Sequence, residues 1–257
     1  MRVCVAQPDM AWEDKKANMI LCRRLMEQAA GKCELIVFPE LTLTGFSMNA
    51  DIAEEPDGAA AEFFCGLSRE FSCCVIFGMA VKSGGKIYNR LCCADKGIIT
   101  AYYDKIHPFS YGGECAVYSA GSKAVEAEIC GMRTGFSICY DLRFPELYQK
   151  LSRNCGCIVC IASWPEKRRE HWLTLLKARA IENQCYIIGC NRTGTGGGLS
   201  YSGDSAVFSP LGTLVAGAGA GSELLFAEID TEDVLAARSS FPVKKDRRED
   251  IYKEFYL

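Results

Sequence analysis

The feature that most constrains the fold is the alternation of short apolar runs with longer segments of helical periodicity. Apolar runs of four to eight residues predict buried strands, and a repeat of about 3.6 residues predicts helices. We expect strands at residues 2–7, 34–38, 74–79, 157–162, 185–190 and 224–229, and helices at 18–30, 59–71, 145–151 and 170–183. Gly31 marks the end of the first helix. Alternating strands and helices indicate an α/β protein.

Three hairpins interrupt this alternation. Segments 88–94 and 98–103 pair around Lys96-Gly97, and segments 205–208 and 213–216 pair around residues 210–212. Segments 125–130 and 133–138 pair with Gly131 at the first central position of a type II′ turn. With about a dozen strands, the hairpins favour two stacked mixed sheets covered by helices over one parallel sheet.

The chain reads as a single domain spanning residues 1–257, because it contains no fixed-period repeat and no Pro- or Ser-rich linker. Its tail, about residues 241–257, is charged and carries spaced aromatic side chains such as Phe241 and Tyr252. We expect the tail to dock on the domain or on a second subunit.

Charge and hydropathy exclude several classes of partner. The formal net charge is −3 and no basic stripe follows the chain, which argues against a nucleic-acid partner. The apolar runs, such as residues 158–162, are too short to span a membrane. The first residues lack the pattern of a signal peptide, so we expect a cytoplasmic protein.

Cysteine is abundant, with 16 residues, most of them in apolar runs where a reduced thiol packs as a small hydrophobic group. Cys155, Cys157 and Cys160 have the density of a metal cluster, but no second pair of ligands and no histidine lies nearby. We interpret them as packing residues and expect neither a metal nor a cofactor.

Cys139 is the exception, in the segment RTGFSICYDLRFPELYQ (133–149). An apolar strand ends there and a helical pattern follows. A thiol at a helix N-terminus has a lowered pKa, and a free backbone N–H such as that of Tyr140 can hold an oxyanion. The alternative is a packed cysteine like its neighbours.

Two charged residues also follow strand ends. Glu40 is either a general base in an apolar pocket or a cap on the following turn. Lys105 is either an oxyanion partner or a solvated surface lysine. Beyond Lys105, the Gly112-Gly113 pair gives a loop able to close over a substrate, and Glu114 is either a second carboxylate of the site or a loop charge.

A Cys–His dyad is the competing design. The chain has two histidines, His107 and His171, and either can in principle activate a thiol. We favour Glu40 and Lys105, because together they meet the same catalytic needs.

The segments FPE with Glu40, YDKIHPF with Lys105 and ICYDLRFPE with Cys139 resemble, in order and spacing, the nitrilase superfamily of carbon–nitrogen hydrolases. The similarity runs from about Val3 to Gly212. Within the superfamily the chain resembles the ω-amidase branch, of the bacterial 2-oxoglutaramate amidase type. The supporting segments are CYDLRFPELY (139–148), SWPEKRREHW (163–172), RAIENQ (179–184), GCNRTGTGGG (189–198) and SYSGDS (200–205).

The resemblance implies a four-layer α-β-β-α sandwich that pairs into a homodimer through its sheets and tail. It also implies a Glu40–Lys105–Cys139 triad, with Cys139 as nucleophile, Glu40 as base and Lys105 as oxyanion partner, and with no metal or cofactor. Glu114 matches a second glutamate that some members use to position the substrate and the lysine.

The substrate that the resemblance implies is a small amide, a short monoamide of a dicarboxylate of the 2-oxoglutaramate or 2-oxosuccinamate type. Its far carboxylate requires a cation, for which Arg143, Arg192 and the basic run 167–169 are candidates. Arg143 can equally brace the turn after Cys139, and Arg192 can be a surface charge. Trp164 either lines the pocket or packs in the core.

Other functions remain open at this point. A nitrilase, an N-carbamoyl amino acid hydrolase and an acyltransferase share the same triad. A non-catalytic binding protein on this fold, or a redox or metal-binding protein, represents a different class.

Overall fold

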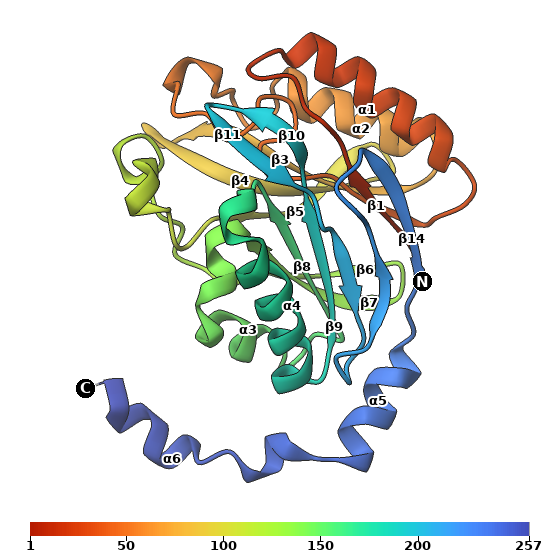
Figure 1. Cartoon of the computed structure of the whole chain (residues 1–257), viewed down its shortest axis with the longest axis vertical. Helices are drawn as coiled ribbons and strands as arrows, with labels where there is room; N and C mark the ends of the chain where they lie inside the picture. The colour runs from red at the N-terminus through yellow and green to blue at the C-terminus, as the bar shows by residue number, and fades with distance from the viewer. Residues whose placement is uncertain (257) are drawn as a thin grey trace.

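Two stacked six-stranded sheets form the centre of the computed structural model, which describes residues 1–256 (Figure 1). The first sheet has the order β14-β1-β2-β3-β4-β5 and consists of β1 (Arg2–Gln7), β2 (Leu35–Val37), β3 (Cys74–Ser83), β4 (Lys86–Asp95), β5 (Ile98–Asp104) and β14 (Glu223–Glu228). The second has the order β13-β12-β9-β8-β7-β6 and consists of β6 (Glu126–Ile129), β7 (Met132–Ile138), β8 (Cys157–Ala162), β9 (Tyr186–Asn191), β12 (Ala206–Phe208) and β13 (Leu214–Gly217).

Helices cover the outer faces of both sheets. The α-helices are α1 (Lys15–Ala29), α2 (Ala59–Glu70), α3 (Pro145–Leu151), α4 (Arg169–Asn183), α5 (Thr231–Ser240) and α6 (Glu249–Tyr252). The 3₁₀ helices are η1 (Ala50–Ile52), η2 (Ser110–Gly112), η3 (Glu114–Ala116), η4 (Cys139–Arg143), η5 (Glu166–Arg168), η6 (Val243–Asp246) and η7 (Lys253–Tyr256). Side chains alternate along β1: Val3 and Val5 join the core between the sheets, whereas Cys4 and Ala6 join the core beneath α1 and α2. This alternation produces the expected four-layer α-β-β-α sandwich.

The strand directions bring several strand ends to one edge of the sandwich. β1, β2 and β3 are parallel, as are β7, β8 and β9. β5 runs in the same direction as β3, because both are antiparallel to β4. The segments that follow β2, β5, β7 and β8 therefore leave the sheets where ligand sites of α/β proteins form.

The expected elements are present, with boundary shifts of a few residues, and two details differ. The β6–β7 turn has positive φ at both central residues, Cys130 (48°) and Gly131 (82°), so it is a type I′ turn and the type II′ prediction is wrong. The hairpin of β10 (Thr193–Gly196) and β11 (Leu199–Ser202) and helix α5 were not predicted. The hairpin is rich in Gly and Ser, and α5 has only two buried residues, so neither leaves a strong apolar pattern.

The tail after α5 contacts the body beside α3. Lys244 Nζ donates to the carbonyl of Ser152 at 2.6 Å, and Glu249 pairs with Arg153 at 2.8 Å. In Figure 1 the tail then leads away to the C-terminus. Tyr252 and Phe255 contact each other at its end; Leu257 lies outside the described residues.

The three cysteines in and just before β8 pack as expected. Cys155, Cys157 and Cys160 are fully buried in the apolar core around the second sheet. Within residues 1–256, no three His, Cys, Asp or Glu side chains are arranged to hold a metal ion. In the same range no helix combines the length and the apolar character needed to cross a membrane.

Candidate active site

Glu40 lies in a tight turn just beyond β2. The turn packs on β3 at Gly78, where an added Cβ would fall 2.5 Å from the backbone nitrogen of Leu41. Thr42 fastens it there, since its N–H donates to the Gly78 carbonyl and its hydroxyl accepts from the Gly78 N–H. The Glu40 side chain is completely buried, and its oxygens accept hydrogen bonds from groups outside the following turn. The alternative role as a cap on that turn is therefore wrong.

Lys105 follows β5 and bridges two carboxylates. Its Nζ lies 2.9 Å from Glu40 Oε1 and 2.8 Å from Glu114 Oε2. All three side chains are buried, which excludes the surface-lysine interpretation of Lys105 and the loop-charge interpretation of Glu114. Burial opposes the ammonium charge, but Glu40 and Glu114 outweigh it and raise the pKa of Lys105 well above its ordinary value.

Asn89 on β4 holds the two carboxylates from the other side. Its Nδ2 donates to Glu40 Oε1 at 2.7 Å and to Glu114 Oε1 at 2.9 Å, while its own Oδ1 is buried without a partner in residues 1–256. The backbone N–H of Ser163, after β8, donates to Glu40 Oε2 at 2.8 Å. Glu40 is thus fixed by groups from both sheets.

Cys139 begins η4 directly after β7, at the strand-to-helix turn that the sequence predicts. Its φ of 48° is in the left-handed region, which non-glycine residues rarely adopt and which recurs at functional sites. The expected lowering of its pKa by a helix dipole is wrong. Burial first and the charge of Glu40 second raise the pKa of the Cys139 thiol well above its ordinary value, against a smaller lowering effect of Lys105. The helix η4 is short, whereas the opposing carboxylate is close in space.

Asp141 connects the segments that carry Lys105 and Cys139. Its Oδ2 accepts from the Tyr103 hydroxyl at 2.8 Å and from the Ile138 N–H at 2.9 Å. Its Oδ1 accepts from the His107 backbone N–H at 3.1 Å and lies 2.7 Å from His107 Nδ1. This buried carboxylate therefore ties the end of β5 to the end of β7.

The structure does not support a Cys–His dyad. His107 is bound to Asp141 and stacks on the ring of Phe144 at 3.8 Å. His171 is exposed, with Nδ1 at 3.2 Å from an Arg143 nitrogen. Within residues 1–256, neither imidazole forms a hydrogen bond with Cys139.

Aromatic and cationic side chains surround Cys139. The Arg143 guanidinium lies 4.7 Å from the centre of the Trp164 ring and 5.9 Å from that of Tyr140. Trp164 is buried, and its backbone adjoins Ser163 of the Glu40 contact. The Tyr140 N–H lies in the first turn of η4, where the helix itself supplies no acceptor.

The structure does not bring Arg192 into this cluster. Its side chain is fully buried, so the surface-charge interpretation is wrong. Its guanidinium donates to the carbonyls of Met10, Thr193 and Thr195 and lies over the Tyr201 ring. These contacts hold the β10–β11 hairpin against the N-terminal segment and differ from the substrate contact we expected.

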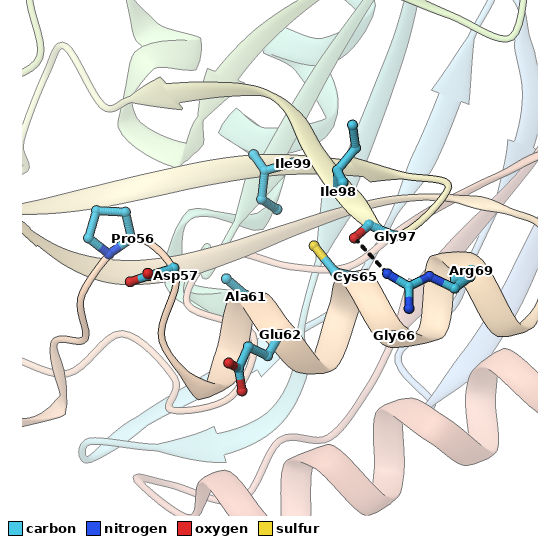
Figure 2. Close-up of a pocket in the computed structure, with 10 residues that line it drawn as sticks. All are labelled: Pro56, Asp57, Ala61, Glu62, Cys65, Gly66, Arg69, Gly97, Ile98 and Ile99. Atoms are coloured by element: carbon cyan, nitrogen blue, oxygen red, sulfur yellow. Dashed lines mark hydrogen bonds between the residues drawn. The ribbon is translucent and has the colours of Figure 1, made fainter.

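A separate groove of about 730 Å³ lies between α2 and the β4–β5 turn (Figure 2). It is lined by Cys65 and Arg69 among others, and Arg69 donates to the carbonyl of Gly97. Burial raises the pKa of Cys65. The groove contains none of the residues that the sequence predicts for catalysis.

Three residues of the site were not predicted from the sequence: Asn89, Ser163 and Asp141. Asn89 is a polar residue inside a strand, and Asp141 lies two residues after the candidate nucleophile, so both carry a weak signal. Ser163 binds the Glu40 carboxylate through its backbone N–H, for which residue type gives no signal, and its hydroxyl donates to the Glu40 carbonyl at 3.4 Å.

Comparisons with known proteins agree with this geometry. Residues 2–239 match the carbon–nitrogen hydrolase family. The chain is 33% identical to a 2-oxoglutaramate amidase of Bacillus subtilis, over 96% of this chain and 97% of that one. It is also 33% identical to the omega-amidase YafV of Escherichia coli K12, over 97% of each chain. The crystal structure of XC1258 from Xanthomonas campestris, a CN-hydrolase superfamily protein with an arsenic adduct in its active site, superposes with a TM-score of 0.92 at 31% identity, over 97% of each chain.

Proposed function

Because this chain belongs to the carbon–nitrogen hydrolase family and is an amidase of the nitrilase superfamily, we propose that it hydrolyses the terminal amide of a short, carboxylate-bearing substrate. The products are the acid and ammonia, and the reaction passes through a thioester on Cys139. One observation carries the mechanism: buried Lys105 lies between two carboxylates, and the charges of Lys105 and Glu40 both act on the Cys139 thiol.

The first step follows from the protonation state of the thiol. With its pKa raised, Cys139 is neutral at rest and requires a base as it attacks. Glu40 Oε2 accepts one hydrogen bond, from Ser163, and a carboxylate oxygen has a further lone pair for the thiol proton. Sulfur bonds to the amide carbon, and the carbonyl electron pair moves to oxygen.

Lys105 and the Tyr140 N–H stabilise that oxyanion. Glu114 and Asn89 keep Lys105 and Glu40 in place and require no movement during the reaction. The carbon–nitrogen bond then breaks as Glu40 returns its proton to nitrogen, and ammonia leaves. Water attacks the thioester with Glu40 again as base, which releases the acid and restores the thiol.

A substrate of the 2-oxoglutaramate or 2-oxosuccinamate type is supported by the relatives named for 2-oxoglutaramate and ω-amides. Our candidate for contact with the far carboxylate is Arg143. Its guanidinium lies over the Trp164 ring and within electrostatic range of the Cys139 side chain. Guanidinium matches carboxylate geometry through paired hydrogen bonds.

The test is ammonia release from a panel of 2-oxoglutaramate, 2-oxosuccinamate, a nitrile and an N-carbamoyl amino acid. We expect turnover of the two ω-amides, and none with Cys139→Ala or Cys139→Ser. The proposal fails if either variant retains wild-type ammonia release. Preferential turnover of the nitrile or the carbamoyl compound would assign the chain to that activity, and no turnover at all would favour a binding protein.

We propose in addition that the chain forms a homodimer. A groove of about 530 Å³ lies between the tail and the body, and the large apolar side chains of Ile181, Leu211 and Phe241 line it and are exposed. Exposed apolar clusters of this kind mark contact surfaces. Light scattering should give twice the chain mass for the wild type and a shift towards monomer for Leu211→Glu. A monomeric wild type would refute the proposal.

A further inference from the structure

A second arginine lies near Arg143. Arg168 lies at the end of η5, and its guanidinium is 5.4 Å from the ring centre of Phe109 and 6.0 Å from that of Tyr111. Like Arg143, it is partly buried. Within residues 1–256, neither arginine has an Asp or Glu oxygen within 4 Å. By contrast, the next residue, Arg169, donates two hydrogen bonds to the Asp204 carboxylate and already has its carboxylate partner.

Trp164 contacts both arginines. Its ring lies under the Arg143 guanidinium, and its Nε1 donates to the carbonyl of Arg168 at 2.8 Å. The ring of Phe109, which lies against the Arg168 guanidinium, has its centre 4.8 Å from that of the Tyr140 ring. The backbone N–H of Phe109 donates to Glu114 at 2.5 Å. Arg168 is therefore connected to the catalytic cluster through its ring partner and through its own backbone.

The two guanidiniums also act on each other. Burial first and the positive charge of Arg168 second lower the pKa of Arg143. Two partly buried cations that lack carboxylate partners repel each other, and an anion bound by both relieves that repulsion. A planar carboxylate accepts paired hydrogen bonds from each guanidinium.

We propose that Arg168, together with Arg143, forms the subsite for the distal carboxylate of the substrate, and that Arg168 determines the preference for ω-amides of dicarboxylic acids over neutral amides. The proposal rests on the amidase function proposed above and deepens it. Because Arg168 stacks on Phe109 and Tyr111, a bound carboxylate also stabilises the loop that carries Glu114.

The experiment compares two amides of equal chain length. Glutaramate, the monoamide of glutaric acid, carries the distal carboxylate, whereas pentanamide ends in a methyl group. We expect the wild type to prefer glutaramate in kcat/KM. Arg168→Gln should lower kcat/KM for glutaramate about 10- to 100-fold, mainly through KM, because a charge-assisted contact is lost. Pentanamide turnover should stay within about threefold, since the neutral substrate makes no such contact.

Two further variants separate a specific contact from general electrostatics and from damage to the loop. Lys177→Gln removes an exposed positive charge on α4, outside the candidate site, and should leave turnover of both substrates unchanged. Arg168→Lys keeps the charge without the planar fork and should recover part of the glutaramate activity. If Arg168→Gln lowers kcat/KM equally for both amides, the role of Arg168 is structural. If the variant keeps the full preference for glutaramate, Arg168 does not bind the carboxylate. Either result overturns the proposal.

A binding measurement keeps this proposal separate from the proposed function. Glutarate, which has no amide, should slow iodoacetamide labelling of Cys139 in the wild type and protect Arg168→Gln at least tenfold less well. Protection without turnover of any amide would refute the amidase function and support the subsite. Equal protection in both proteins would refute the subsite, whatever the turnover.

Discussion

Asp141 offers a quantitative test of how the fold assembles the site. Its carboxylate receives hydrogen bonds from Tyr103, Ile138 and His107, and so joins the segments of Lys105 and Cys139. Asp141→Asn retains the shape but replaces one oxygen by an NH₂ group. If nitrogen takes the place of Oδ2, it faces the Ile138 N–H; if it takes the place of Oδ1, it faces the His107 N–H. In both orientations one backbone N–H loses its acceptor.

The expected cost follows from this count. A buried N–H without an acceptor costs about 1–3 kcal/mol, and the remaining bonds lose the assistance of the charge. We therefore expect Asp141→Asn to lower the free energy of unfolding by about 2–4 kcal/mol and the melting temperature by roughly 5–15 °C. The ends of β5 and β7 become less firmly joined, and a misplacement of about 1 Å costs roughly 10²-fold in rate. The expected loss in kcat is of that size, measured well below the melting temperature.

The matched control is Tyr103→Phe, which leaves the carboxylate with its two backbone partners. It removes one donor to the carboxylate and also the acceptor of the partly buried Ile106 N–H. It should cost about 1–2 kcal/mol in unfolding free energy and less than tenfold in kcat. Circular dichroism melting and ammonia release measure both quantities. The reasoning is refuted if Asp141→Asn keeps kcat within twofold of the wild type, or if Tyr103→Phe is the more damaging substitution.

Three further perturbations test other parts of the structure. Glu40→Gln removes the general base, so amide turnover should stop. It also removes a charge that raises the pKa of Cys139, so iodoacetamide labelling of that thiol should start at a lower pH than in the wild type. An unchanged pH profile of labelling would contradict this. Gly78→Ala forces the Glu40 turn off β3 and should lower the free energy of unfolding by about 1–3 kcal/mol and remove most of the activity. Gly66→Ala is the control, because Gly66 lies on α2 with open space around it, and it should be neutral or stabilising. Equal effects of the two substitutions would show that the close approach at Gly78 is unimportant. Burial lowers the pKa of Lys244 to about 8, so between about pH 8 and 10.5 the unfolded chain binds the extra proton and stability rises with pH. Lys244→Met should reduce that slope in urea unfolding, and an unaltered slope would refute the assignment.

The sandwich could be predicted because its strands are short apolar runs, as in β8, where all six residues are buried. Strand β1 and helix α3 even have the predicted bounds. Prediction failed where an element is held by contacts that leave no periodic pattern. The β10–β11 hairpin is fixed by Arg192, whose side chain links the carbonyl of Thr195 in the hairpin to that of Met10, which is distant in sequence. No local window contains that information.

The same distinction explains the site. Glu40, Lys105 and Cys139 each follow a strand, so topology alone places them near one edge. The protonation state of Cys139 depends first on its burial and then on the charge of Glu40, and reasoning from the helix terminus gave the wrong direction. Asn89 and Asp141 were missed for a related reason, since each acts by accepting or donating hydrogen bonds between segments far apart in the chain.

The sequence does not show which arginine is available to bind the substrate carboxylate. Arg168, Arg169 and Arg192 are equally plausible carboxylate ligands in the sequence, because each precedes or follows a regular element. Asp204 binds Arg169, and backbone carbonyls bind Arg192. Within residues 1–256, the Arg168 guanidinium contacts only aromatic rings, and that of Arg143 contacts two rings and an exposed histidine. A guanidinium that has no carboxylate partner retains its capacity to bind one. The availability of a cation therefore depends on its tertiary partners, and this availability distinguishes a substrate ligand from a structural brace.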